Sequence, residues 1–234
     1  CTPFLARENW RTPYQGVLQT LVQRSVSSGL YFPLEEKCSR ALGSHALGGQ
    51  LAGIVNALLL NPIALVKHQS WGSEHYNVSF ARTALRLYRD AGPLVFFRGA
   101  IGASMRDGTF GLCFSMRHVW RQPDDGVATS FAISLLCAAV GTTLSSPFNY
   151  VRNLAYAAES SASMESPRAK MDFWRCSMEE LFGQAAKQAS PLASMRHLQD
   201  RLRIGWGTTR VAVGMALTDQ IYKICSRFLM PKPP

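Results

Sequence analysis

The sequence is poor in charge. Charged residues make up 17% of its 234 residues, whereas ordinary soluble domains carry about 25%. Residues 46–66 and residues 126–151 contain no charged side chain, and about 20 such residues in a helix are enough to cross the hydrocarbon core of a bilayer. These two stretches argue against a soluble helical protein and predict that the chain is embedded in a membrane.

The sequence also lacks the residue clusters from which metal sites, disulfide frameworks and catalytic centres are built. Its six cysteines are widely spaced and include no Cys-x-x-Cys pair, and its five histidines are equally dispersed. Zinc sites and disulfide-stapled domains need ligands at recognisable short spacings. No nucleophile–base pair and no phosphate-binding loop occurs in the sequence. We therefore expect no metal, no cofactor and no enzymatic activity.

The net charge of +10 is of the sign that attracts nucleic acid or acidic membrane surfaces. The basic residues form no single run and no aromatic–basic RNA motif, so nucleic acid is not an expected partner. No secretory or transit signal opens the chain, which begins at Cys1 rather than at Met. Either a leader has been removed or the sequence starts downstream of the natural N-terminus.

One mostly apolar stretch, from Phe97 to Met116, carries two adjacent opposite charges. Arg106 and Asp107 lie near its middle. Membrane helices accommodate ionisable residues where these face a partner, a bundle interior or a water-filled cavity. Two interpretations remain open: the pair binds a ligand, or its members neutralise one another.

Two further apolar stretches, residues 14–34 and 204–223, bring the predicted membrane helices to five. Two amphipathic segments lie between them and predict surface helices. Each has apolar side chains at helical spacing: Phe80, Ala84, Leu85 and Tyr88 in the first, and Trp174, Met178, Leu181 and Phe182 in the second.

The first uncharged stretch contains two backbone signals. Gly49 and Gly53 form a Gly-x-x-x-Gly pair, which lets another helix approach closely in lipid. Pro62 lies near the end of the stretch and predicts a kink, because proline removes a helical hydrogen bond and clashes with the preceding turn.

The sequence repeats itself. Pro62-x-Ala64-x-x-Lys67 recurs 85 residues later as Pro147-x-Asn149-x-x-Arg152, and each copy closes an uncharged stretch. The shorter apolar stretches align on Gln23, Arg106 and Arg210, and an aromatic-x-Gly element lies seven residues before the first two, at Tyr14-Gln-Gly16 and Phe97-Arg98-Gly99. Such a period indicates a protein built from structural repeats.

With this period and order of elements, the sequence resembles the mitochondrial carrier family over nearly its whole length. That family has three repeats, each of two membrane helices joined by a short amphipathic matrix helix. The resemblance implies an all-α membrane bundle that shows five transmembrane helices of an expected six, since the first would fall before Cys1. It implies a single carrier-like domain, 1–234, divided into a partial repeat 1–42 and the repeats 43–122 and 123–234.

The resemblance also implies a multi-pass protein of the mitochondrial inner membrane. Segments 1–15, 67–98 and 152–203 would face the matrix; they hold 15 Lys and Arg residues, against seven on the opposite face. This asymmetry agrees with the preference of positive charge for the side from which the membrane is built. The expected partners are the lipid bilayer, with cardiolipin as a candidate lipid, and other membrane subunits.

By resemblance, Gln23, Arg106, Asp107 and Arg210 lie where carriers contact their substrate. An arginine followed by an acidic residue at the second contact position resembles amino acid carriers. An Arg–Asp pair beside Arg210 would suit a zwitterion, with its carboxylate on arginine and its amine on Asp107.

The gates of the family are incomplete in this sequence. At the matrix side Pro62, Lys67, Pro147 and Arg152 keep the motif, but its acidic positions hold Ala64 and Asn149. At the opposite side Glu36 alone matches the acidic positions, while Val119 and Lys223 occupy the others. Both latches are therefore expected to be lost, and with them the means of holding either state of a two-state transporter.

This reasoning predicts a degenerate, non-transporting structural or accessory subunit of a large inner-membrane complex, either a respiratory chain complex or ATP synthase. The alternative is an active carrier of a small anionic or zwitterionic metabolite such as an amino acid.

Overall fold

The computed structural model describes residues 17–72, 79–122, 124–158, 166–188, 190–202 and 204–229. Every regular element in these ranges is helical, which confirms the all-α prediction. The helices in chain order are α1 (Val17–Leu42), α2 (His45–Gly72), α3 (Phe80–Ala91), the 3-10 helix η2 (Pro93–Phe97), α4 (Ala100–Ser115), α5 (Arg117–Trp120), α6 (Val127–Ala157), α7 (Pro167–Ala186), α8 (Pro191–Leu202) and α9 (Trp206–Leu229).

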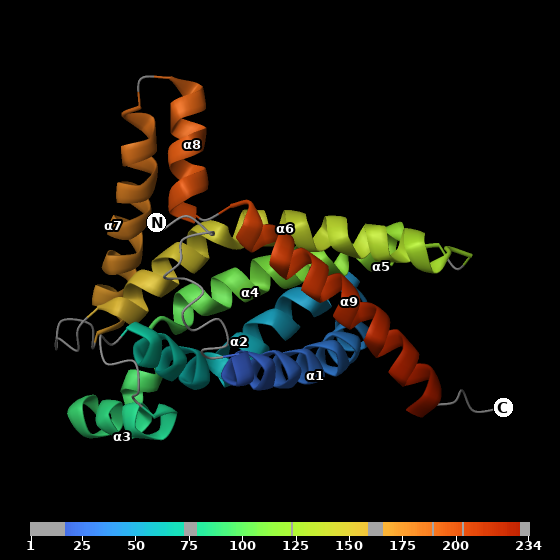
Figure 1. The fold of residues 1–234 in the computed structure, drawn as a ribbon, viewed down its shortest axis with the longest axis horizontal. Coiled ribbons are helices and arrows are strands. Elements are labelled where there is room, and N and C mark those ends of the chain that lie inside the picture. Colours follow the sequence, from blue (N-terminus) through green and yellow to red (C-terminus); the bar gives the residue numbers. More distant parts are fainter. Residues whose placement is uncertain are drawn as a thin grey trace.

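Five of these helices form the main bundle (Figure 1): α1 packs on α2, α2 on α4, α4 on α6 and α6 on α9. Its two ends are named here after the short helices beside them. The α5 end holds the last turns of α1 and α9, and the α3 end holds the last turns of α2 and α6. Helices α7 and α8 form a hairpin that stands across the bundle at the α3 end.

Two helices in the described ranges are long and apolar enough to cross a membrane, at His45–Ser70 and Val127–Ala157. They correspond to the two uncharged stretches of the sequence. Both continue through their prolines, Pro62 and Pro147. The membrane-spanning role of α1, α4 and α9, and with it the count of five spans, stays a prediction, as does the division into repeats.

The contact between α2 and α4 depends on glycine. A β-carbon added at Gly53 would collide with the backbone carbonyl of Asp107, and one added at Gly111 would collide with that of Gly49. The two backbones therefore touch, and the close approach predicted from Gly49 and Gly53 is confirmed.

Gly53→Val is expected to destabilise the protein by about 1–3 kcal/mol, because the added side chain must push α4 away. Gly29→Val is the matched control, since a β-carbon at Gly29 meets open space. Thermal unfolding of both purified variants in detergent checks this prediction. Equal unfolding midpoints for the two variants would show that the α2–α4 contact is not tight.

Two apolar clusters fill the bundle. The first draws buried side chains from all five bundle helices: Tyr31, Phe32, Ala52, Phe114, Cys137, Ala138 and Ala212. The second lies at the α3 end and joins α2, α3, η2 and α6 through Leu65, Val66, Leu87, Val95 and Tyr156.

The surface helix predicted after residue 79 is present as α3, but its buried face differs from the expected one. Thr83 and Leu87 are buried, whereas Leu85 and Tyr88 are exposed. The side of α3 that packs on its neighbours is therefore rotated about the helix axis from the side that its apolar residues predict. The reason is the partner surface: α3 packs on α2 and η2 through Leu87 and the half-buried Phe80 and Ala84.

Candidate functional site

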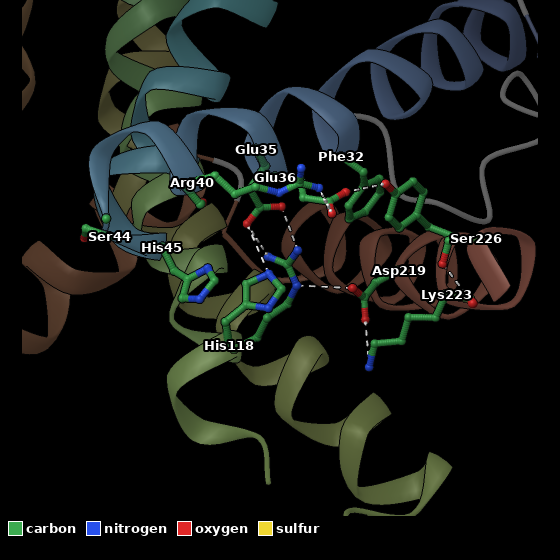
Figure 2. Close-up of a pocket in the computed structure, with 14 residues that line it drawn as sticks. Phe32, Glu35, Glu36, Arg40, Ser44, His45, His118, Asp219, Lys223 and Ser226 are labelled. Atoms are coloured by element: carbon green, nitrogen blue, oxygen red, sulfur yellow. Dashed lines mark hydrogen bonds and ion pairs between the residues drawn. The ribbon is translucent and has the colours of Figure 1, made fainter. Parts of the chain in front are cut away.

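Three charged side chains from three helices meet inside the α5 end of the bundle (Figure 2). Glu35 comes from α1, Arg117 from α5 and Asp219 from α9, and their exposed fractions are 3%, 1% and 2%. The Arg117 guanidinium binds Glu35 through two bonds of 3.0 and 2.7 Å, and its Nε lies 3.2 Å from Asp219 Oδ1. One arginine thus bridges the first and last helices of the bundle.

Further polar groups complete this network. Arg121 pairs with Asp219 and donates to the Ser130 carbonyl at 3.0 Å. The Ser115 hydroxyl donates to Glu35, and the Ser134 hydroxyl lies 3.2 Å from Asp219. We call Glu35, Arg117, Arg121 and Asp219 the ionic latch. Its two arginines balance its two carboxylates, and buried charges persist only when paired and hydrogen-bonded in this way.

Aromatic rings support the latch. The Arg117 guanidinium lies 4.0 Å from the centre of the Phe114 ring, where a cation is favoured. Burial by itself lowers the pKa of Arg117, but Glu35, Tyr31 and Asp219 together more than offset this and raise the pKa above its ordinary value. Phe32 of α1 stacks on Tyr222 of α9 with centroids 4.9 Å apart. The first and last bundle helices are therefore joined at this end by charge and by apolar contact.

A cavity of about 570 Å³ lies outside the latch at the same end. Figure 2 shows its polar lining, which includes Glu36, Arg40, His45, His118 and Lys223. The His45 and His118 rings stack with centroids 4.8 Å apart, and His118 Nε2 lies 3.5 Å from Glu35. Glu35, Arg117 and Asp219 also line this cavity, so the latch forms its inner wall.

The α3 end is tied by uncharged groups. The Tyr156 hydroxyl of α6 donates to Asn61 Oδ1 of α2 at 2.6 Å. The Asn61 amide nitrogen donates to the carbonyls of Phe96 and Arg98 at 2.7 and 3.0 Å. Gln69 of α2 also donates to the Tyr156 carbonyl. We call Asn61 and Tyr156 the amide latch; it joins α2 and α6 to the start of α4.

Gly99 makes room for the amide latch. It begins α4 with a φ of +70°, which favours glycine, and a β-carbon there would meet the Tyr156 ring at 2.7 Å. The Phe97-Arg98-Gly99 element found in the sequence therefore has a local structural role. Its glycine lets the Tyr156 ring lie against the backbone.

The predicted substrate-level residues are not brought together. Arg106 and Asp107 pair with each other, with Nε 2.6 Å from Oδ1, and remain partly exposed. Gln23 accepts a hydrogen bond of 3.0 Å from Lys67. Arg210 is exposed on α9, and none of the described contacts joins it to the Arg106–Asp107 pair. Their role in substrate contact stays a prediction.

The predicted gate residues lie as follows. Lys67 reaches Gln23 of α1, and Arg152 reaches its neighbour Asn153 and the face of Tyr156. Pro62 and Pro147 lie inside α2 and α6. Glu36 is exposed and pairs with Arg40 one turn later. Pro62 thus directly follows Asn61 of the amide latch in α2, whereas Glu36 lies outside the ionic latch.

The sequence predicts that the ion pairs on the side opposite the matrix are lost. The ionic latch at the α5 end corrects this expectation. The buried acidic residue of α1 is Glu35, and Glu36, one position later, points to the surface pair with Arg40. Asp219 gave a sequence signal, because a carboxylate inside an apolar helix needs a partner. Arg117 and Arg121 gave none, since they lie in a polar connection.

Residues 41–119 match the family model described as mitochondrial carrier protein. This match spans about a third of the chain, and over these residues the chain is similar to the mitochondrial carrier family. The match runs from the end of α1 to α5 and includes Pro62, Lys67, Arg106, Asp107 and Arg117. No curated protein and no solved structure matches the chain significantly.

The match supports a carrier-like membrane protein, and the family it describes is one of the mitochondrial inner membrane. Members of the family are transporters rather than enzymes. The proline motifs that are predicted to mark the matrix side lie in α2 and α6, toward the α3 end.

Proposed function

We propose that this carrier-like protein is a non-transporting structural subunit of a large inner-membrane complex, a respiratory chain complex or ATP synthase. The observation that carries the proposal is that both ends of the bundle are tied in one conformation. The ionic latch holds α1, α5 and α9 together, while the amide latch holds α2, α6 and the start of α4.

Transport by alternating access requires each end to open in turn. Opening the α5 end would separate Arg117 from Glu35 and Asp219, the two carboxylates that hold it in this conformation. Opening the α3 end would leave the buried Asn61 without its three hydrogen-bonded neighbours. A subunit that only fills and stabilises an assembly needs neither opening.

The test is gentle extraction of the tagged protein from mitochondrial inner membranes, followed by native electrophoresis and mass spectrometry of the co-migrating subunits. The proposal predicts stable migration with one multi-subunit complex. Recovery of the protein as a free monomer, with no co-migrating complex under conditions that keep other complexes intact, would reject it.

The bilayer is the second proposed partner. A cavity of about 750 Å³ at the α3 end is lined in part by Arg98, Arg152 and Lys170. Three cations around one cavity suit a lipid headgroup with two phosphates. Cardiolipin, the lipid expected from the family resemblance, has this headgroup chemistry.

One observation favours the alternative, an active carrier of a small anionic or zwitterionic metabolite such as an amino acid. Arg106 and Asp107 lie within α4, and their side chains are 28% and 21% exposed. They offer one cation and one carboxylate, the two groups that a zwitterion needs.

If the protein is a carrier, Arg106→Ala is expected to lower uptake into liposomes about 10- to 100-fold, since a charge-assisted carboxylate contact contributes about 1.5–3 kcal/mol. Arg40→Ala is the matched control, because Arg40 is exposed and makes a surface pair. Uptake of labelled amino and keto acids by the two variants is the measurement. Equal uptake by both variants would show that the Arg106–Asp107 pair is not part of a substrate site.

A further inference from the structure

Two histidine rings meet in the cavity at the α5 end. His45 is the first residue of α2, and His118 is the second residue of α5. Their rings stack with centroids 4.8 Å apart and with planes inclined by 23°. Both residues are exposed and line the cavity, so protons from solvent can reach them. Histidine is the side chain whose charge ordinarily changes between about pH 5 and pH 8.

His118 is the ring that faces the ionic latch. Its Nε2 lies 3.5 Å from Glu35 Oε1, and Glu35 is buried. A neutral imidazole carries a proton on one of its nitrogens, whereas the charged ring carries a proton on each. Protonated His118 therefore directs an N–H group and a positive charge at Glu35. This contact adds to the two bonds that Glu35 accepts from Arg117.

His45 is less well placed to take the same proton. None of the contacts in the described part of the chain joins it to a carboxylate. His45 begins α2, and the positive end of the helix dipole at an N-terminus disfavours a cation. A second proton on the stack would also place like charges 4.8 Å apart. The stack therefore takes up one proton, and this proton binds to His118.

The other charges around the stack have partners of their own. The ionisable residues that line the cavity besides the two histidines are Glu35, Glu36, Arg40, Arg117, Asp219, Tyr222 and Lys223. Among the described residues, α4 and α6, which pack on α5, contribute none to this lining. Glu36 pairs with Arg40, and both Arg121 of α5 and Lys223 lie toward Asp219. Figure 2 shows the two histidines together and apart from Lys223.

We propose that the His45–His118 stack is a proton-responsive brace of the ionic latch: as the pH falls, one proton binds to His118 and strengthens the tie between α5 and α1. Stability that comes from a protonated histidine is present below about pH 6.5 and is lost as the pH rises. The brace depends on the latch alone, so it is expected whether the protein is a subunit or a carrier.

The test is thermal unfolding of the full chain in detergent, at a series of pH values from about 8 to about 5. The wild type is compared with His118→Gln, His45→Gln and His118→Lys. His45→Gln is the matched control, because it removes the stacked ring but leaves His118 facing Glu35. His118→Lys supplies a positive charge at every pH of the series. Each variant changes an exposed side chain, so each should fold.

On going from the high to the low end of the series, the unfolding midpoint of the wild type should rise by about 2–4 °C relative to that of His118→Gln. The midpoint of His45→Gln should show the same relative rise. His118→Lys should unfold above His118→Gln by a similar interval at every pH. Other groups titrate in all of these chains, so their contribution cancels in each comparison.

Parallel pH profiles of the wild type and His118→Gln would overturn the proposal. Loss of the rise in His45→Gln, with the rise kept in His118→Gln, would also overturn it, because the proton would then belong to the other ring. Equal midpoints of His118→Lys and His118→Gln at about pH 8 would contradict it as well, since a charge at this position would then not act on Glu35.

Discussion

Arg117→Met is expected to destabilise the protein by about 3–5 kcal/mol, because it leaves two buried carboxylates without their shared partner. Glu35 would lose two bonds, and Asp219 would keep only Arg121 and its neighbouring polar groups. Thermal unfolding in detergent, together with the yield of monodisperse protein, measures the loss. We expect this to be the largest effect of any single substitution discussed here.

Two comparisons separate a buried network from a general effect of losing an arginine. Arg40→Met removes the exposed Glu36 pair, and such pairs contribute about 0–1 kcal/mol. The combined variant Glu35→Gln, Arg117→Met, Asp219→Asn should recover much of the stability lost by Arg117→Met, since no buried carboxylate is left unpaired. Equal destabilisation by Arg40→Met and Arg117→Met would contradict the ionic latch.

Asn61→Leu is expected to produce the second large effect. Asn61 is 1% exposed and satisfies the Phe96 and Arg98 carbonyls and the Tyr156 hydroxyl. Each buried polar group left without a partner costs about 1–3 kcal/mol, so the loss should reach several kcal/mol. The measurement is again thermal unfolding of the purified variant.

A graded series makes this prediction specific. Tyr156→Phe removes one of the three bonds and should cost about 1–3 kcal/mol, less than Asn61→Leu. Asn153→Leu is the matched control, because Asn153 on α6 is only partly buried and accepts one bond from its neighbour Arg152. If Asn153→Leu proved as harmful as Asn61→Leu, the α3 end would not depend on the amide latch.

Much of the fold was predictable because long uncharged stretches are a strong sequence pattern for long apolar helices. Long uncharged runs gave α2 and α6, and the spacing of Gly49 and Gly53 gave the close approach of α4. Helix α8 was not predicted, since its sequence is largely polar and its apolar contacts are supplied by α7. The buried side of α3 was mistaken because its pattern shows which residues are apolar but not where α2 and η2 lie.

The candidate site was harder to predict. Glu35 and Glu36 are adjacent, and about 100° of helix rotation separates their directions. The sequence gives no measure of that rotation relative to α9. Arg117 joins Glu35 to Asp219 because the helix breaks just before it: α4 ends at Ser115 and α5 begins at Arg117. Neither glycine nor proline marks this break in the sequence. The repeat predicts two ends of the bundle, but it does not identify the groups that tie them.

The central claim, that both ends are held at once, is tested most directly by distances between encoded spin labels in the reconstituted protein. One pair, at Arg40 of α1 and Ile224 of α9, spans the α5 end, and a second pair, at Ser25 of α1 and Ala157 of α6, spans the α3 end. Pulsed electron paramagnetic resonance should give one narrow distance distribution for each pair. Two populations at either end, shifted by a panel of amino and keto acids, would reveal alternating access and contradict the claim.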